Sequence, residues 1–127
     1  MSIGLIVMPK SSKPIIGICG SRSIKNLNLD FYLDKDNIGE IVSGGANGVD
    51  TLAEQWAKRN SIEFIAFLPQ YDIYGGKYAP LKRDEDIVNY CDKLVCFWDG
   101  KSKGSLYTMN YAQKIGREVI LHLIEER

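Results

Sequence analysis

Three turns rich in glycine and small polar residues, each directly after a short apolar run, are the parts of this chain best suited to bind an anion. They span residues 20–23 (Gly-Ser-Arg-Ser), 43–48 (Ser-Gly-Gly-Ala-Asn-Gly) and 99–105 (Asp-Gly-Lys-Ser-Lys-Gly-Ser). Glycines let the backbone approach a ligand closely, and a helix that starts after such a turn presents unbonded N–H groups. Strand-to-helix turns of a parallel sheet share one edge, so we expect the three turns to form one phosphate-binding crevice.

Charged side chains beside these turns are candidates for the same crevice. Arg22 follows the first apolar run, and its fork of donors suits a phosphate or a carboxylate, although an exposed ion pair explains it equally well. Asp50 falls in the first turn of a predicted helix, where the dipole favours a carboxylate, so we favour a capping role for it. Lys77 and Arg83 precede the fourth apolar run, and we expect them to close over the bound anion.

The glycines also admit a purely structural interpretation. Residues 44–48 permit a tight turn and close packing of a helix on the sheet whether or not a ligand binds. The dinucleotide fingerprint G-x-G-x-x-G is absent, and residues 99–105 lack the Gly-Lys-Ser/Thr ending of a P-loop. Contacts with a base or a ribose must add to the affinity, because phosphate contacts alone leave it marginal. The aromatic candidates for such contacts are Trp98, Tyr71, Tyr74 and Tyr78.

Composition bounds the class of protein. The chain has 127 residues with 45% hydrophobic content, enough for one domain with a full core and too short for two. Its 16 basic residues balance 16 acidic ones, which argues against a broad basic face for nucleic acid. Cys19, Cys91 and Cys96 lack the spacing of a metal site or a disulfide framework, and residues 3–8 are too short for a membrane span. We therefore expect a cytoplasmic protein with no metal, cofactor or membrane partner, and the sequence is compatible with a homo-oligomer.

Alternating strand and helix patterns predict an α/β fold, a Rossmann-like three-layer sandwich with a mostly parallel sheet. The predicted strands are residues 15–19, 40–43, 62–68, 93–98 and 118–124. The predicted helices are residues 83–90 and 105–115, a weak candidate at 27–33, and an amphipathic helix whose inward face is Val49, Leu52, Ala53, Trp56 and Ala57. Residues 70–80 are expected to form a loop, and residues 1–14 an appendage to one domain that spans residues 15–127.

Four motifs, taken in order, resemble the YspA-like branch of the SLOG superfamily, which unites the DNA-uptake protein DprA/Smf with the LOG cytokinin-activating enzymes. They are Gly20-Ser21-Arg22, Ser43-Gly44-Gly45-Ala46-x-Gly48-x-Asp50, Gly76-Lys77-x-Ala79-x-x-x-Arg83 and Phe97-Trp98-Asp99-Gly100-x-Ser102-x-Gly104-Ser105. The resemblance implies a Rossmann-like fold that binds nucleotides or nucleotide-derived ligands. The ligand-binding residues expected from the turns and motifs together are Gly20, Ser21, Arg22, Ser43, Gly44, Gly45, Ala46, Gly48, Asp50, Lys77, Arg83, Trp98, Asp99, Ser102, Gly104 and Ser105.

The resemblance to LOG phosphoribohydrolases is incomplete. The family pattern Ala-Gly-x-x-Arg-Asn-x-x-Met keeps its arginine here, as Arg83, which also matches the catalytic arginine of LOG enzymes, but three neighbours differ. Their essential glutamate follows Pro-Gly-Gly-x-Gly-Thr, and in this chain Thr108 stands at its position. A threonine cannot serve as a carboxylate, so we assign no catalytic residue and expect a sensor or sequestering module. The alternatives are an N-glycosidic nucleotide hydrolase that uses Asp50, Glu54 or Asp99 instead, and a DprA-like single-stranded DNA binder, which the charge balance disfavours.

Overall fold

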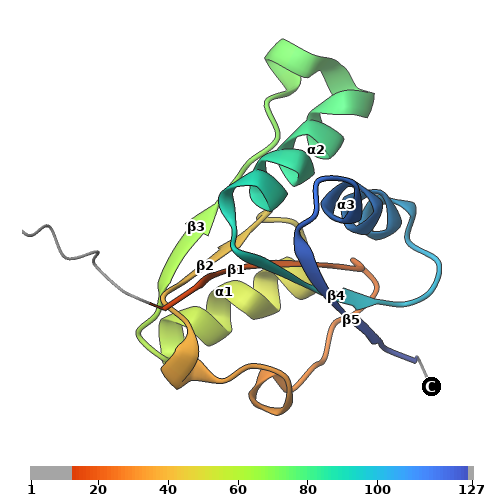
Figure 1. The fold of residues 1–127 in the computed structure, drawn as a ribbon. Helices are drawn as coiled ribbons and strands as arrows, with labels where there is room; N and C mark the ends of the chain where they lie inside the picture. Colours follow the sequence, from red (N-terminus) through yellow and green to blue (C-terminus); the bar gives the residue numbers. More distant parts are fainter. Residues whose placement is uncertain (1–12, 126–127) are drawn as a thin grey trace, which may run out of the picture.

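The chain folds around one parallel sheet of five strands in the order β3-β2-β1-β4-β5 (Figure 1). The structure is a computed structural model that describes residues 13–125. The strands are β1 (Ile15–Gly20), β2 (Glu40–Ser43), β3 (Glu63–Ala66), β4 (Lys93–Trp98) and β5 (Glu118–Leu123). Every neighbouring pair is parallel, so the predicted α/β, Rossmann-like architecture is confirmed, and the sheet is wholly rather than mostly parallel.

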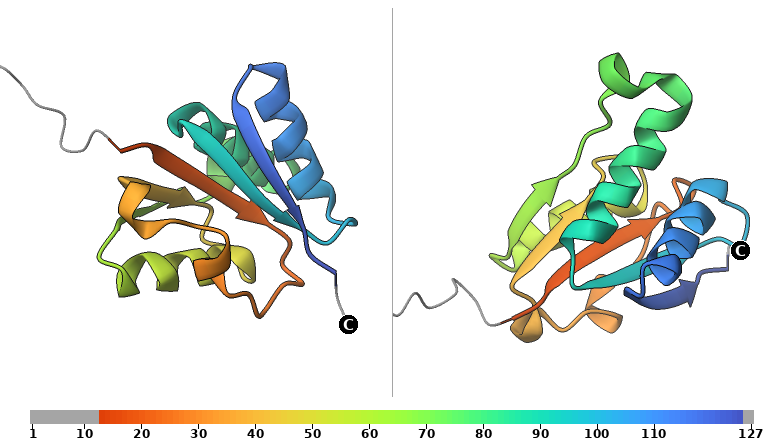
Figure 2. Two further views of the ribbon diagram at one scale, coloured as in Figure 1. Left: turned by 60° about the horizontal axis from the view of Figure 1, so that its bottom comes forward. Right: turned by 45° about the horizontal axis from the view of Figure 1, so that its top comes forward.

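Helices cover both faces of the sheet and complete the three layers (Figure 2). Helix α1 (Val49–Arg59) packs on β1, β2 and β3, and α2 (Tyr71–Tyr90) and α3 (Lys103–Lys114) lie together on the opposite face. Two apolar clusters fill the spaces between the layers, one around Trp56 and Phe97 on the α1 side and one around Ile87 and Leu94 on the α2–α3 side. The strands β1 and β4 are buried in the centre, as their unbroken apolar sequences predict.

Helix α1 follows the predicted pattern. Val49, Ala53, Trp56 and Ala57 are buried, and Leu52 packs against the same cluster. Because α1 begins directly after the turn at residues 44–48, burial of this face brings the turn to the carboxyl edge of the sheet. The same edge receives the ends of β1 and β4, which pair in register from Ile16 and Lys93 to Gly20 and Phe97.

The predicted loop at residues 70–80 is wrong. These residues form the first half of α2, which extends beyond the body of the domain (Figure 1). Gly75 has positive φ (79°) and kinks the helix, so the residues that suggested a loop instead divide one long helix into two parts. Pro80 lies only five residues after the kink and removes one N–H from the restarted helix, where Ala79, Arg83 and Ile87 face inward.

Other predictions needed smaller corrections. The weak helix at residues 27–33 is a single 3-10 turn, Leu29–Phe31, and a second one follows at Lys35–Asn37. The asparagine and aspartate before these turns cap them with their side chains, which keeps the segment from continuing as an α-helix. Of the predicted appendage at residues 1–14, residues 1–12 lie outside the described part of the chain. Within residues 13–125, no helix has both the length and the apolar character of a membrane span.

Candidate functional site

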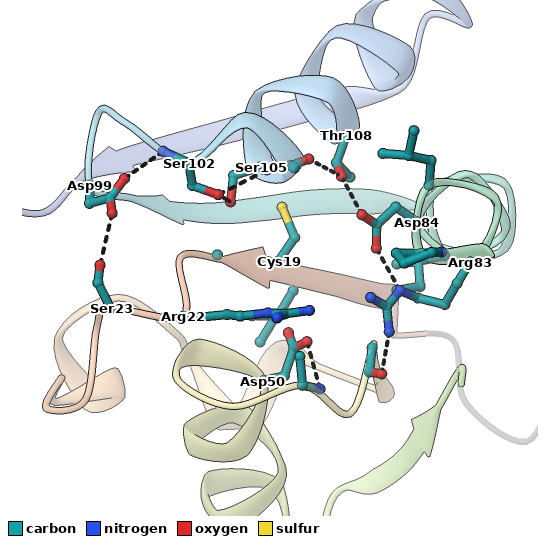
Figure 3. A pocket seen from close by; sticks show the side chains of 18 residues that line it. Cys19, Arg22, Ser23, Asp50, Arg83, Asp84, Asp99, Ser102, Ser105 and Thr108 are labelled. Atoms are coloured by element: carbon teal, nitrogen blue, oxygen red, sulfur yellow. Dashed lines mark hydrogen bonds and ion pairs between the residues drawn. The ribbon is translucent and has the colours of Figure 1, made fainter. Parts of the chain in front are cut away.

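A cavity of about 400 Å³ opens at the carboxyl edge of the sheet, where β1, β2 and β4 end (Figure 3). Walls from α1, α2 and α3 enclose it, because all three glycine-rich turns and the buried half of α2 meet there. Ten of the expected ligand-binding residues line it, namely Gly20, Arg22, Gly44, Ala46, Asp50, Arg83, Asp99, Ser102, Gly104 and Ser105. The structure thus brings the three turns together as the sequence predicted.

Six expected residues lie outside the cavity wall. They are Ser21, Ser43, Gly45, Gly48, Lys77 and Trp98. Three of them form hydrogen bonds with residues of the cavity wall. Ser43 Oγ donates to Asp50 Oδ1 (2.6 Å), and Ser21 Oγ accepts from the backbone N–H of Asp99 (3.0 Å). Trp98 Nε1 donates to the Ser102 carbonyl (2.9 Å). Lys77 is exposed on the projecting half of α2.

Arg83 and Asp50 hold the turn at residues 44–48 in place. Arg83 is buried, and its Nη1 donates to the carbonyls of Gly44 (2.5 Å) and Phe67 (3.3 Å), while its Nε donates to Asp84 Oδ1 (2.7 Å). Asp50 Oδ2 accepts from the N–H of Ala46 (3.1 Å). A Cβ at Gly44 would lie 2.6 Å from Arg83 Nη1 and 3.0 Å from Asp50 Oδ2, so a side chain there would have to displace the Arg83 guanidinium from its hydrogen bond with the Gly44 carbonyl.

Burial raises the pKa of Asp50, and the hydrogen bonds from Ser43 and Ala46 together with the positive charge of Arg83 oppose the rise. The carboxylate of Asp50 therefore organises the turn at the start of α1 from within the protein. The expected capping role is therefore corrected: Gly48 is the N-cap of α1, and Asp50 accepts from Ser43 and Ala46 before the helix rather than from an N–H of the helix itself.

Arg22 has a different environment from Arg83. The residues on either side of it are tied to Asp99: Ser23 Oγ donates to Asp99 Oδ2 (2.8 Å), and Ser21 Oγ accepts from the Asp99 N–H. Gly48 abuts the Arg22 backbone, where a Cβ would lie 2.7 Å from Arg22 Cα. The Arg22 side chain reaches across the cavity and has no hydrogen bond or ion pair with any residue of the described segment 13–125 (Figure 3). The backbone of Arg22 is therefore held in place by its neighbours, while its guanidinium is free to contact a ligand.

The turn at residues 99–105 closes the cavity on the α3 side. Backbone N–H groups of Lys101 and Ser102 donate to Asp99 Oδ1 and hold the pKa of Asp99 well below its usual range. Ser102 then caps α3 by accepting from the Ser105 N–H (3.3 Å). Gly104 differs from the other wall glycines, because a Cβ there would meet no atom within 4 Å. The first turn of α3 is therefore open toward the cavity.

Asp84 and Thr108 are wall residues that the sequence-based site omitted. Thr108 Oγ1 lies 3.1 Å from Asp84 Oδ2 and 2.8 Å from the carbonyl oxygen of Gly104, and these two acceptors share its single proton. Burial raises the pKa of Asp84 to about 6, against the opposing effects of Arg83 and Thr108. The position glutamate occupies in LOG enzymes thus holds a threonine that contacts a carboxylate from α2. The sequence did contain a signal that could have identified Asp84, because it directly follows Arg83, which matches the arginine of the family pattern.

Cys19 and the acidic residues of the described segment give no indication of thiol chemistry or of a metal site. Cys19 lines the cavity, and its hydrogen bond with Cys96 and its burial raise the pKa of its thiol, so the thiol stays protonated at neutral pH. Among residues 13–125, no three side chains of His, Cys, Asp or Glu are grouped so that they could hold a metal ion. His122 stacks on Phe97 and contacts Tyr32, away from the cavity wall.

The aromatic candidates for a base contact do not line this cavity. Tyr74 lines a second cavity of about 300 Å³ under the kink of α2, and Arg83 forms part of the wall of both cavities. Tyr71 and Tyr78 are exposed on the same projecting segment. The apolar part of the main cavity comes instead from Ile18, Leu81, Ile87 and Pro80.

Comparison with known proteins found a matching family, a similar protein sequence and a similar solved structure. The model of the YspA, cpYpsA-related SLOG family matches residues 14–74. The Gene 61 protein of Mycobacterium phage D29 is 32% identical over 85 residues, which are 63% of this chain and 68% of that protein. The structure is similar to DNA processing protein A (DprA) from Streptococcus pneumoniae, with a TM-score of 0.66 and 21% identity. The match covers 86% of this chain and 50% of the DprA chain, so this chain corresponds to half of that protein and shares its fold.

Proposed function

We propose that this chain, which belongs to the YspA, cpYpsA-related SLOG family, binds a nucleotide or nucleotide-derived ligand in the cavity at the carboxyl edge of its sheet. The observation that best supports the proposal is Arg22, whose guanidinium lies in the cavity without a partner among residues 13–125. A positioned, unpaired guanidinium beside the first turn of a helix is suited to a phosphate group.

The chemistry of the cavity walls favours a ligand that is anionic at one end only. The first turn of α3 borders the cavity on one side and Asp84 beside Arg83 on another, and the Arg22 side chain extends between them, with Asp50 next to its guanidinium in the view of Figure 3. A volume of about 400 Å³ lies within the range of small-molecule sites. Micromolar affinity needs about 8 kcal/mol, and a hydrogen bond to a charged group contributes about 1.5 to 3 kcal/mol, so the neutral part of the ligand must contribute as well.

The role we propose is that of a sensor or sequestering module rather than an efficient enzyme. Thr108 cannot supply the carboxylate that stands at its position in LOG enzymes. Thermal unfolding of the protein with a panel of ribonucleoside mono-, di- and triphosphates tests ligand binding. We expect at least one nucleotide to raise the Tm with increasing concentration, whereas inorganic phosphate does so only weakly. A Tm that no nucleotide changes would contradict the proposal.

A second candidate function, N-glycosidic cleavage of a nucleotide, is favoured by one observation. Asp84 contacts Thr108, lines the cavity and has a pKa raised to about 6, which suits a group that exchanges protons near neutral pH. The three carboxylates proposed from the sequence are placed less well: Glu54 pairs with Lys58 on the outer face of α1, and Asp50 and Asp99 are held by the turns. Chromatography of AMP incubated with wild type and with Asp84→Asn decides this, since enzyme-dependent release of adenine and ribose 5-phosphate must disappear in the variant.

The likeness to DprA concerns the fold alone at 21% identity, and the balanced charge of the chain gives a DNA-binding role no further support.

A further inference from the structure

Asp84 is a carboxylate at the cavity wall with acceptor capacity to spare. Its side chain is 16% exposed, Oδ1 accepts from Arg83 Nε and Oδ2 accepts from Thr108 Oγ1. A carboxylate offers about four lone-pair sites, so these two hydrogen bonds leave one site on each oxygen. Among the described residues no further donor is bonded to either oxygen, and Figure 3 shows the group at the edge of the open space. The remaining sites are therefore available to a ligand.

The surroundings of Asp84 restrict what that ligand group can be. Arg83 Nε and Thr108 Oγ1 fix the plane of the carboxylate, so its two free acceptor sites have a set orientation. A phosphate is excluded, because a second anion there would face both Asp84 and the nearby Asp50. The group must be neutral or positive and must offer two donors close together.

Vicinal hydroxyls of a sugar ring meet this requirement. Two adjacent O–H groups can donate to the two oxygens of one carboxylate, which is how acidic side chains hold a ribose in other nucleotide sites. The anionic end of such a molecule would reach Arg22 and the start of α3, which line the same cavity. Asp50 also has one hydrogen bond on each oxygen, from Ser43 and Ala46, but it is a poorer acceptor for a ligand because it is buried, with only 8% exposed.

We infer that Asp84, oriented by Arg83 and Thr108, binds the vicinal hydroxyls of a ribose, so that the site selects ribonucleotides against deoxyribonucleotides. The inference rests on the proposed nucleotide binding and narrows it to a ligand class. It makes Asp84 a specificity-determining residue whichever base the ligand carries.

The test compares matched pairs of ligands by titration calorimetry. The probes are the four ribonucleoside 5′-monophosphates with their 2′-deoxy counterparts, together with ribose 5-phosphate and 2-deoxyribose 5-phosphate. We expect wild type to bind the ribose form about 10- to 100-fold more tightly than the deoxy form, since one hydrogen bond to a charged group is lost. In Asp84→Asn this ratio should fall below about threefold, because the amide offers one acceptor without charge.

Glu85→Gln is the matched control, since Glu85 is the next carboxylate on α2 but accepts from Tyr107 and Tyr78 outside the cavity wall. It should keep the wild-type ratio. Equal binding of ribose and deoxy forms by wild type, or an unchanged ratio in Asp84→Asn, would overturn the inference and leave nucleotide binding in place. Binding of none of these probes, together with a Tm that no mono-, di- or triphosphate changes, would overturn both.

Discussion

The turns before α1 and before α3 are both rich in glycine, and both meet the same cavity, but the protein uses their glycines differently. In the turn before α1, Gly44 lies between Arg83 and Asp50, and Gly48 has positive φ and abuts the Arg22 backbone. In the first turn of α3, Gly104 has open space where a side chain would point. The first turn is shaped by the protein's own packing, and the second leaves its backbone open to the cavity. Similar sequence patterns at one sheet edge can thus have separate structural and ligand-facing roles.

Gly48→Ala tests the packing role of the turn before α1, and it should have the largest effect on stability. The added Cβ would lie 2.7 Å from backbone atoms of Ser21 and Arg22, and φ of 81° is unfavourable for alanine. We expect a loss of about 4 kcal/mol in the free energy of unfolding, measured by urea denaturation, from strain and overpacking together. A loss below about 1 kcal/mol would show that this turn adjusts freely and is not a packing element.

Arg83→Ala should have the next largest effect. The substitution removes the donor to the Gly44 and Phe67 carbonyls and leaves Asp84 without its charged partner. We expect about 3 kcal/mol of destabilisation, in the range for breaking a buried ion pair. Arg22→Ala is the matched control, and its unfolding free energy should stay within about 0.5 kcal/mol of wild type. Equal stability of both variants would contradict the separate roles of the two arginines.

The buried carboxylate of Asp84 predicts an unusual dependence of stability on pH. Its pKa is about 6 in the folded protein against 3.8 for an unperturbed aspartate, so between these values the folded state binds the additional proton. The free energy of unfolding should therefore fall as pH rises from about 4 to 6, by about 2 to 3 kcal/mol from this group, and stay level above. Urea titrations at several pH values should show this contribution in wild type and its loss in Asp84→Asn. If wild type and Asp84→Asn showed the same dependence of stability on pH, another titratable group would be responsible for it.

Gly104→Ala should have the smallest effect on stability, and of the opposite sign to Gly48→Ala. Alanine is favoured over glycine within a helix, and no atom lies within 4 Å of the added Cβ, so we expect a gain of about 0.5 kcal/mol. The larger Gly104→Val should keep the fold while narrowing the cavity, and its nucleotide affinity should fall. A valine variant that binds as wild type would remove this turn from the ligand's surroundings.

Much of this arrangement could be predicted from the sequence, and the exceptions have physical reasons. Strand β1 and helix α1 follow from local hydrophobic patterns, which are short-range properties. The helix at the start of α2 was missed because Gly75 and Pro80 indicate breaks locally; a break does occur at Gly75, whose φ and ψ are not helical, but it separates two helical parts rather than forming a loop.

The site was harder to predict than the fold because it depends on contacts between distant residues. Asp84 and Thr108 are 24 residues apart and meet only through the packing of α2 on α3. The sequence also treats Gly48 and Gly104 alike, because each follows a strand and borders a helix. Their difference lies in φ and in the atoms that surround them, which no local pattern records.

The most direct test of the central claim is calorimetric titration of wild type, Arg22→Ala and Lys25→Ala with the nucleotide that most raises the Tm. Lys25 is an exposed cation of the same loop outside the cavity wall, so Lys25→Ala controls for the loss of charge. We expect Arg22→Ala to weaken binding by about 1.5 to 3 kcal/mol, or about 10- to 100-fold, and Lys25→Ala to stay within about twofold of wild type. Equal affinity of Arg22→Ala and wild type would contradict this claim.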